Sequence, residues 1–293
     1  MRYRFKGIIP PMLTAFTEDG AFDKESTRNI AHFLKDKVQG LFICGTYGSG
    51  PLLEVKEKKM VIDTVMEEVE GKIPVIVHVG STYTSAAIDV AKFAERAGVS
   101  AIASVSPYYY SHNETDIISY FAKLVDSVSV PVYVYNNPKT VGYSISPSLL
   151  EKLYDIGVQG LKDSSFSLVT FFEFVDTLGD KDFEFIIGTE ALIVGAYVLG
   201  ARGVISGVAN ALPEFIVDLY NACESGDMEK ASRLQLLALR LRKLLHISSS
   251  ISVTHSILKL RGVNAGFPRH PFTPLSRDEE KLLERELKKL GVL

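Results

Sequence analysis

The 293-residue sequence lacks several features that would mark a special class of protein. Its two cysteines, Cys44 and Cys223, are too few for a disulfide framework, so we expect a reducing, cytoplasmic setting. The longest apolar run, residues 191–201, is well short of the about 20 residues that a membrane helix needs. Pro10 and Pro11 interrupt the N-terminal apolar run, which is not a convincing signal peptide. Membrane spanning and secretion are therefore disfavoured.

Charge of one sign is also missing, because 32 basic side chains stand against 35 acidic ones. Without a broad positive field, nucleic acid is not an expected partner. The six histidines show no ligand-like spacing, and no cysteines pair closely, so we expect no metal site. His78 lies inside an apolar run and is expected to be a hydrogen-bonded core residue.

A short apolar run followed by an amphipathic stretch recurs over the first 210 or so residues. Runs rich in Val and Ile are typical of strands buried on both faces, and the stretches between them have helical periodicity. No G-x-G-x-x-G motif follows the first run, which removes the usual sign of an open dinucleotide-binding sheet. Eight repeats instead favour a closed parallel (β/α)8 barrel. The runs begin at Gly7, Gly40, Pro74, Ser100, Pro131, Val158, Phe183 and Arg202.

Capping residues mark where several of the helices begin. Asn113 and Ser146 are good N-caps, and Pro147 suits a first helical position. No strand is expected after residue 212, where Pro213 and Asp227 open further helices. We therefore predict an α/β protein with a (β/α)8 barrel over residues 1–212 and a C-terminal helical extension over residues 213–293. The apolar stripe of one barrel helix is predicted to comprise Leu168, Phe171, Phe172 and Val175.

Active sites of such barrels lie at the carboxyl ends of the strands, where Lys162 is the most informative residue. Strand alternation allows its side chain to point into the barrel. Burial would lower the pKa of the amine and leave it neutral, able to attack a carbonyl and form a Schiff base. The alternative is an outward lysine paired with a surface acid.

Two further strand ends complement Lys162. Tyr135 ends the preceding strand, where a phenol beside an amine can move protons; the alternative is an ordinary core aromatic. The segment GTYGSGP, residues 45–51, can turn backbone N–H groups towards a small anion, with Thr46 as a hydroxyl donor. It lacks the lysine of a phosphate-binding loop, so a carboxylate fits better. A tight strand-to-helix turn is the alternative.

The motifs PMLTAF, GTYGSG, PYYY, YNNP, GLKDS and GFPRHPFTPL together resemble those of the pyruvate-dependent lyase superfamily. This superfamily includes dihydrodipicolinate synthase, N-acetylneuraminate lyase and 2-keto-3-deoxygluconate aldolase. The resemblance covers essentially the whole chain. It implies a barrel with C-terminal helices, assembled as a homotetramer (a dimer of dimers), and a lyase that needs no metal or organic cofactor.

The resemblance also implies roles for individual residues. Lys162 matches the Schiff-base lysine, and Tyr135 the proton-relay tyrosine. Thr46 and Tyr47 match the pair that holds the pyruvyl carboxylate, although many members carry Thr or Ser where this chain has Tyr47. Tyr109 matches a tyrosine lent across a subunit interface. The positions that shape the pyruvyl pocket are matched by Gly188 and Ile205.

Departures from the motifs distinguish among the superfamily members. Dihydrodipicolinate synthases carry an arginine where this chain has Thr140, and the neighbouring Lys139 does not replace its bidentate reach. Sialic-acid lyases usually carry two acids where this chain has Thr189 and Glu190. GTxGxGP followed by PYYY is most similar to archaeal-type 2-keto-3-deoxygluconate aldolases. In that case Thr189, Glu190 and Ser206 are candidates to contact the hydroxyl groups of the aldehyde.

We therefore expect a class I aldolase that cleaves a 2-keto-3-deoxy sugar acid to pyruvate and an aldehyde such as glyceraldehyde. Whether the substrate is phosphorylated stays open, although His112 and Lys139 are expected near the mouth of the site. The near alternatives are a synthase, an N-acetylneuraminate lyase, or a hydratase-aldolase or dehydratase of the same superfamily. Outside it stand a phosphate-binding barrel isomerase that uses the ISGVAN loop and a catalytically silent scaffold.

Overall fold

The computed structural model describes residues 4–293 and contains one sheet of eight parallel strands, in the order β1-β8-β7-β6-β5-β4-β3-β2. Each apolar run predicted as a strand forms one, as expected for runs that bury both faces. The strands are β1 (Gly7–Ile8), β2 (Leu41–Ile43), β3 (Val75–His78), β4 (Ala101–Val105), β5 (Val132–Asn136), β6 (Gly160–Asp163), β7 (Glu184–Ile187) and β8 (Gly203–Val204).

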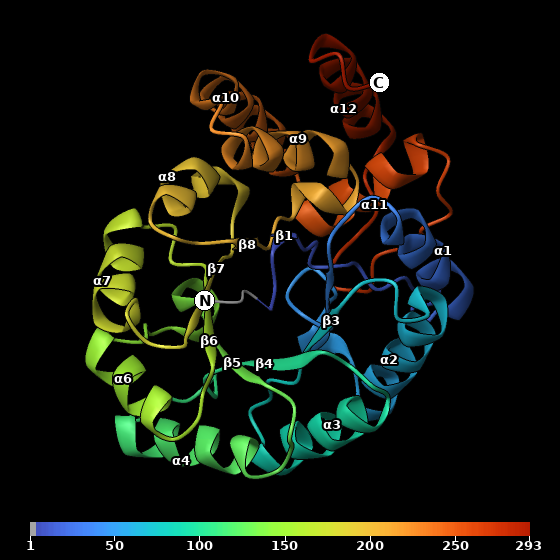
Figure 1. Cartoon of the computed structure of the whole chain (residues 1–293). Helices are drawn as coiled ribbons and strands as arrows, with labels where there is room; N and C mark the ends of the chain where they lie inside the picture. The colour runs from blue at the N-terminus through green and yellow to red at the C-terminus, as the bar shows by residue number, and fades with distance from the viewer. Residues whose placement is uncertain (1–3) are drawn as a thin grey trace.

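Backbone hydrogen bonds between the first and second strand regions close this sheet into a barrel. The Gln39 N–H donates to the Ile8 carbonyl, and the Phe42 N–H to the Pro10 carbonyl, each at 3.0 Å. The Met12 N–H donates back to the Phe42 carbonyl at 2.9 Å. Seen along the barrel, the strands are surrounded by a ring of helices (Figure 1). The predicted (β/α)8 barrel is confirmed.

The helices alternate with the strands and begin where the sequence predicts. The Asn113 side chain accepts a hydrogen bond from the Asp116 N–H, and that of Ser146 from the Leu149 N–H. These bonds satisfy N–H groups that have no partner within a helix. The barrel helices are α1 (Lys24–Lys35), α2 (Val55–Val69), α3 (Thr84–Arg96), α4 (Glu114–Val125), α5 (Pro138–Val141), α6 (Pro147–Asp155), α7 (Leu168–Leu178) and α8 (Ile193–Val198).

The predicted apolar stripe of α7 is wrong at one position. Phe171, Phe174 and Leu178 form the buried face, whereas Phe172 is 52% exposed. Residues 171 and 172 point about 100° apart on a helix of 3.6 residues per turn, so the narrow contact with the barrel accepts one of them. Because this helix carries apolar residues on more than one face, its sequence does not show which face packs against the barrel.

Aromatic and small side chains fill the barrel interior in alternation. The inward cluster includes Phe42, Tyr133, Tyr135 and Ile186, which separate the two ends of the barrel. Gly160 lies within this layer because a Cβ atom there would come within 2.1 Å of the Tyr133 ring. The interior is therefore packed rather than open, and a side chain that enters from a strand end reaches a dry environment.

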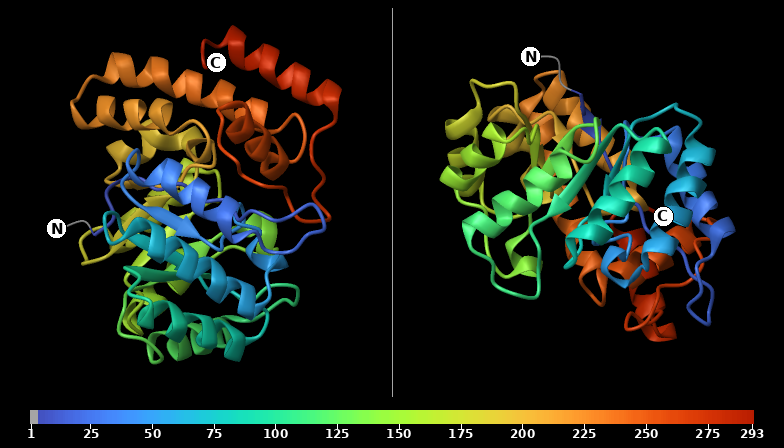
Figure 2. Two further views of the ribbon diagram at one scale, coloured as in Figure 1. Left: turned by 90° about the vertical axis from the view of Figure 1, so that its right-hand side faces the viewer. Right: turned by 90° about the horizontal axis from the view of Figure 1, so that it is seen from below.

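Four helices follow the barrel and pack together on one side of it (Figures 1 and 2). Among residues 4–293, no helix is both long and apolar enough to cross a membrane. The division at residue 212 stays a prediction, although the first of these helices begins at Pro213. Two short 3-10 turns, η2 (Glu190–Leu192) and η3 (Val208–Asn210), adjoin them. The helices are α9 (Pro213–Glu224), α10 (Met228–Leu245), α11 (Ser250–Leu260) and α12 (Arg277–Lys289).

Asn210 joins the start of the barrel to its end, which gives a test of the closure. Its Oδ1 accepts from the Leu13 N–H and its Nδ2 donates to the Pro11 carbonyl, both at 3.1 Å, and the residue is fully buried. Asn210→Ala would leave both groups buried without partners, so we expect the free energy of unfolding to fall by about 1–3 kcal/mol. Urea denaturation measures this loss. Asn264→Ala, at an exposed position, is the control. An equal decrease in the free energy of unfolding of both variants would contradict a stabilising role for the Asn210 hydrogen bonds.

Candidate active site

Lys162 enters the barrel interior from the carboxyl end of β6. The residue is 3% exposed, and its Nζ lies 3.8 Å from the ring centroids of both Phe42 and Tyr135. Among the described residues, none offers this nitrogen a hydrogen-bond acceptor or an ion-pair partner. The alternative of an outward lysine paired with a surface acid is therefore wrong.

This setting decides the protonation state of the amine. Burial lowers the pKa of Lys162 well below its usual value, because the charged form cannot be hydrated there. The faces of two aromatic rings attract a cation, but they do not replace water. The amine is consequently held as a nucleophile that can attack a carbonyl carbon.

Tyr135 stands beside Lys162 because β5 and β6 pair these two residues in register. Burial raises the pKa of the Tyr135 phenol, so it keeps its proton, while hydrogen bonds with Thr46 and Ser164 act in the opposite direction. Asn137 Nδ2 also donates to the Tyr135 oxygen at 3.1 Å. A phenol fixed by several partners next to an amine can pass protons during the formation and loss of water.

The loop after β2 presents two backbone donors to the same space. In the described part of the chain, the N–H groups of Thr46 and Tyr47 donate to no other protein group. Gly50 allows the tight loop, since a Cβ atom there would lie 1.9 Å from the Cys44 carbonyl oxygen. The left-handed positions are taken by Cys44 and Ser49 rather than by the glycines. Adjacent unpaired N–H groups suit a carboxylate.

A buried carboxylate forms the other side of the site. Glu190 is 1% exposed; its Oε2 accepts from Ser206 Oγ at 2.8 Å, and its Oε1 pairs with Arg242 Nη1 at 2.9 Å. Gln235 Nε2 also donates to the Glu190 carbonyl at 2.8 Å. Gln235 and Arg242 both come from α10, so the helical extension fixes this wall of the barrel mouth. Such a partnered carboxylate can accept hydrogen bonds from substrate hydroxyl groups.

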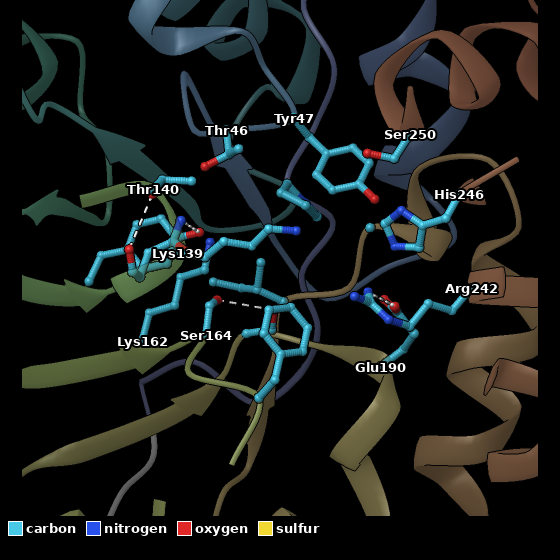
Figure 3. Close-up of a pocket in the computed structure, with 17 residues that line it drawn as sticks. Thr46, Tyr47, Lys139, Thr140, Lys162, Ser164, Glu190, Arg242, His246 and Ser250 are labelled. Carbon is cyan, nitrogen blue, oxygen red and sulfur yellow. Dashed lines mark hydrogen bonds and ion pairs between the residues drawn. The ribbon is translucent and has the colours of Figure 1, made fainter. Parts of the chain in front are cut away.

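These groups line one cavity of about 190 Å³ at the carboxyl end of the strands. Figure 3 shows the Lys162 amine directed towards its centre, with Thr46 and Tyr47 on one side and Glu190 and Arg242 on another. Burial raises the pKa of Tyr47 to about 12, so this phenol also stays protonated.

The structure brings together most of the residues that the sequence predicted for the site. Those that line the cavity are Lys162, Tyr135, Thr46, Tyr47, Gly188, Glu190 and Ile205. Thr189 does not line it: its hydroxyl is buried and accepts from the Ala191 N–H. Ser206 contacts Glu190 instead of the cavity. Tyr109 is 84% exposed and His112 lies outside the cavity, whereas Lys139 and Thr140 line it.

Three lining residues from the helical extension were not anticipated. Arg242 and His246 lie one turn apart at the end of α10, and Ser250 begins α11. Burial and the nearby charge of Arg242 lower the pKa of His246. The i, i+4 spacing of Arg242 and His246 was the available signal, but it does not tell which helix face meets the barrel.

The surroundings of His78 agree with the role predicted for it. The residue is 4% exposed; its Nδ1 lies 3.2 Å from the Cys44 carbonyl oxygen, and its Nε2 accepts from the Val105 N–H. Burial lowers its pKa to about 3, so it is a neutral, hydrogen-bonded core residue as predicted. Residues 4–293 hold no group of three or more His, Cys, Asp or Glu side chains arranged to ligate a metal.

Comparison with known proteins agrees with this geometry. A profile of the Dihydrodipicolinate synthetase family matches residues 4–290. The 4-hydroxy-tetrahydrodipicolinate synthase of Methanopyrus kandleri is 34% identical over 297 residues, which cover 100% of this chain and 99% of that protein. The crystal structure of YagE from E. coli K12 in complex with pyruvate has a TM-score of 0.94, 29% identity and 99% coverage of both chains. KD(P)GA from T. tenax has a TM-score of 0.90 and 30% identity, covering 97% of this chain and 99% of that one.

A strand-end amine kept neutral inside a parallel barrel is the arrangement of an enzyme that works through a Schiff base, and the fold and site define such a lyase. The family match and the 34% identity show that the chain belongs to the dihydrodipicolinate synthetase family, within the superfamily of pyruvate-dependent class I aldolases. The resemblance seen in the sequence motifs is confirmed.

The burial of Lys162 predicts how stability depends on pH. We expect Lys162→Met to raise the free energy of unfolding at neutral pH, because methionine fills the channel without an ionisable group. Between the folded-state pKa and 10.5, unfolding the wild type takes up a proton at Lys162. Over that range its stability therefore rises by about 1.4 kcal/mol per pH unit. The advantage of the variant therefore shrinks as pH rises.

Urea titrations over a series of pH values measure this difference. Lys123→Met, on the exposed face of α4, is the matched control and is expected to show no such slope. A constant difference between Lys162→Met and the wild type at every pH would mean that Lys162 has the same protonation state in the folded and unfolded chain.

Proposed function

We propose that this enzyme is a class I aldolase that cleaves a 2-keto-3-deoxy sugar acid of the 2-keto-3-deoxygluconate type to pyruvate and an aldehyde. The observation that carries the proposal is the position of the buried Lys162 amine, between the free N–H groups of Thr46 and Tyr47 and the hydrogen-bonding wall at Glu190. The end of the cavity at Thr46 and Tyr47 suits the carboxylate of the keto acid, and the end at Glu190 suits a hydroxylated chain. The similarity to YagE, whose crystal structure is a complex with pyruvate, supports the first part.

The first chemical step joins the substrate to Lys162. The carboxylate accepts hydrogen bonds from the Thr46 and Tyr47 N–H groups, which places the C2 carbonyl beside Nζ. The amine adds to C2, Tyr135 passes protons to the departing oxygen, and water leaves to give the protonated imine. The reaction requires no metal or organic cofactor.

The second step breaks the carbon–carbon bond. Tyr135, whose oxygen accepts from Asn137 Nδ2, takes the proton from the C4 hydroxyl group. The C3–C4 electron pair moves towards the imine nitrogen, so the aldehyde leaves and an enamine stays on Lys162. Protonation at C3 and hydrolysis release pyruvate and restore the amine. Glu190 accepts a hydrogen bond from a hydroxyl group of the leaving aldehyde.

Two features favour a sugar acid over the alternatives. Thr140 lines the cavity where the resemblance places the second-carboxylate arginine of dihydrodipicolinate synthases, which disfavours that substrate. At the strand-eight loop, Glu190 accepts from Ser206 Oγ, and the Val208 N–H lies 3.5 Å from the same carboxylate oxygen. The donors of this loop are thus occupied by Glu190 and are not free to bind a phosphate group, which disfavours the phosphate-binding isomerase. Synthase names among the relatives make dihydrodipicolinate synthesis the leading alternative.

Substrate panels test this proposal directly. We expect pyruvate release from 2-keto-3-deoxygluconate to exceed release from N-acetylneuraminate, measured by coupled reduction of pyruvate. Borohydride with pyruvate should add a stable mass to Lys162 and none to Lys162→Met. Tyr135→Phe should lower kcat by about 100-fold or more, because a positioned proton donor is lost. Faster condensation of pyruvate with aspartate semialdehyde than with glyceraldehyde would instead identify a synthase.

We also propose a cytoplasmic homotetramer, a dimer of dimers. Both cysteines are buried free thiols, which agrees with a reducing compartment. Two separate apolar areas are exposed, and two kinds of interface are what a dimer of dimers requires. One is formed by Tyr109 and Tyr110 after β4, where Tyr109 would reach the partner's cavity. The other is on α7 and α8, which are neighbours outside the barrel (Figure 1), and comprises Val169, Phe172 and Val198.

Light scattering tests the assembly. The wild type is expected to have four times the mass of the 32.3-kDa chain. A charge at the second area, in Val169→Glu combined with Val198→Glu, should give a dimer, because both side chains are 69% exposed in the single chain and buried only by a partner. Tyr83→Glu, 65% exposed elsewhere, is the control. A wild-type monomer would refute the assembly without affecting the proposed chemistry.

A further inference from the structure

Phe166 has an unusual backbone conformation at the edge of the catalytic cavity. It lies in the loop between β6 and α7, four residues after Lys162, with a φ of 61°. Bulky side chains rarely adopt this left-handed conformation. Of the described residues other than glycine that do so, Phe166 is the one that lines the cavity. Strained residues of this kind persist where their surroundings hold them and gather at functional sites.

Hydrogen bonds on both sides of Phe166 fix the loop. The Asp163 carboxylate accepts from the Ser165 N–H at 3.2 Å and from its hydroxyl at 2.7 Å. The Ser167 N–H donates to Ser165 Oγ at 3.3 Å, and the Ser167 side chain caps α7 by accepting from the Thr170 N–H at 3.1 Å. The backbone before and after Phe166 is thereby fixed, which sets the direction of its Cα–Cβ bond.

That direction brings the ring to the ion pair between Arg242 and Glu190 in the cavity wall. The Arg242 guanidinium carbon lies 4.7 Å from the Phe166 ring centroid, and Arg242 in turn holds Glu190 (Figure 3 shows this pair). Phe166 is nevertheless 43% exposed. Core packing therefore does not account for an aromatic ring in a strained conformation, whereas a role at the cavity does.

We infer that Phe166 is a specificity-determining residue that limits the length of the aldehyde part of the substrate. The inference rests on the proposed aldolase function. The hydrocarbon edge of a short hydroxylated aldehyde packs on the ring, while its hydroxyl groups face Glu190. Because the loop cannot shift the ring aside, acceptors longer than three carbons collide with it. The substrate class is thereby narrowed to six-carbon 2-keto-3-deoxy acids.

Competing condensations of pyruvate with glyceraldehyde and with a five-carbon aldose test this inference in the intact enzyme. Phe166→Gly removes the ring, and glycine adopts the left-handed backbone conformation without strain. The ratio of kcat/KM for the longer aldehyde to that for glyceraldehyde should rise by about tenfold or more, a change typical of altered pocket contacts. Borohydride trapping of pyruvate on Lys162 should proceed as in the wild type, because the imine end of the cavity is unchanged.

Two further variants separate the ring from the backbone. Phe166→Tyr retains the ring and should keep the wild-type ratio. Glu70→Gly is the matched control, since it relaxes a left-handed residue (φ 49°) at the end of α2, away from the cavity, and should leave the ratio unchanged. An unchanged ratio in Phe166→Gly with normal trapping would overturn the inference.

Failure of the proposed function gives a different result. In that case the wild type traps pyruvate but condenses it with neither hydroxyaldehyde. The ratio is then measured between glutarate semialdehyde, with five carbons, and malonate semialdehyde, with three. Phe166→Gly must raise the ratio of the longer to the shorter aldehyde by about tenfold for the role of the ring to stand.

Discussion

Everything at the active end of this barrel depends on keeping one amine out of water. The pKa of Lys162 is lowered because the residue is buried beside the rings of Phe42 and Tyr135, and no acid among residues 4–293 forms an ion pair with it. The cavity does contain a buried acid, Glu190, and a free carboxylate would favour the ammonium form. Its pairing with Arg242 confines that charge to the far wall. The ion pair therefore protects the reactivity of the lysine as well as shaping the cavity.

The two ends of the cavity are built from different parts of the fold. The register of β5 and β6 sets the position of Tyr135 next to Lys162. The tight loop after β2 positions the N–H groups that can donate to a substrate carboxylate. The opposite wall combines Glu190, at the start of η2 after β7, with side chains from the end of α10 and the start of α11. The register of the sheet is rigid, whereas side chains on loops and on a surface-packed helix can be substituted with little effect on the barrel. Imine chemistry can thus stay constant while the second substrate changes.

The sequence predicted the parts of this structure that depend on local pattern. Strands buried on both faces show as apolar runs, and caps such as Asn113 need only residues three positions apart. Lys162 was predictable because strand alternation and the strand-end rule are both local. Arg242 and Phe166 were not, because their positions depend on how a distant helix and a strained loop pack. Thr189 and Ser206 occupy the expected strand ends, but their hydroxyl groups turn to neighbouring protein atoms.

The place of Arg242 on α10 also has a consequence for biosynthesis. The chain emerges from the ribosome with its strands, Lys162 and Tyr135 first, and residues 242–250 follow only after the barrel sequence is complete. Until then Glu190 lacks its Arg242 partner, and the side chains that α10 and α11 add to the cavity are missing. A nascent barrel therefore possesses Lys162 and Tyr135 before Arg242 exists to pair with Glu190, so the ion pair of the cavity wall is completed last.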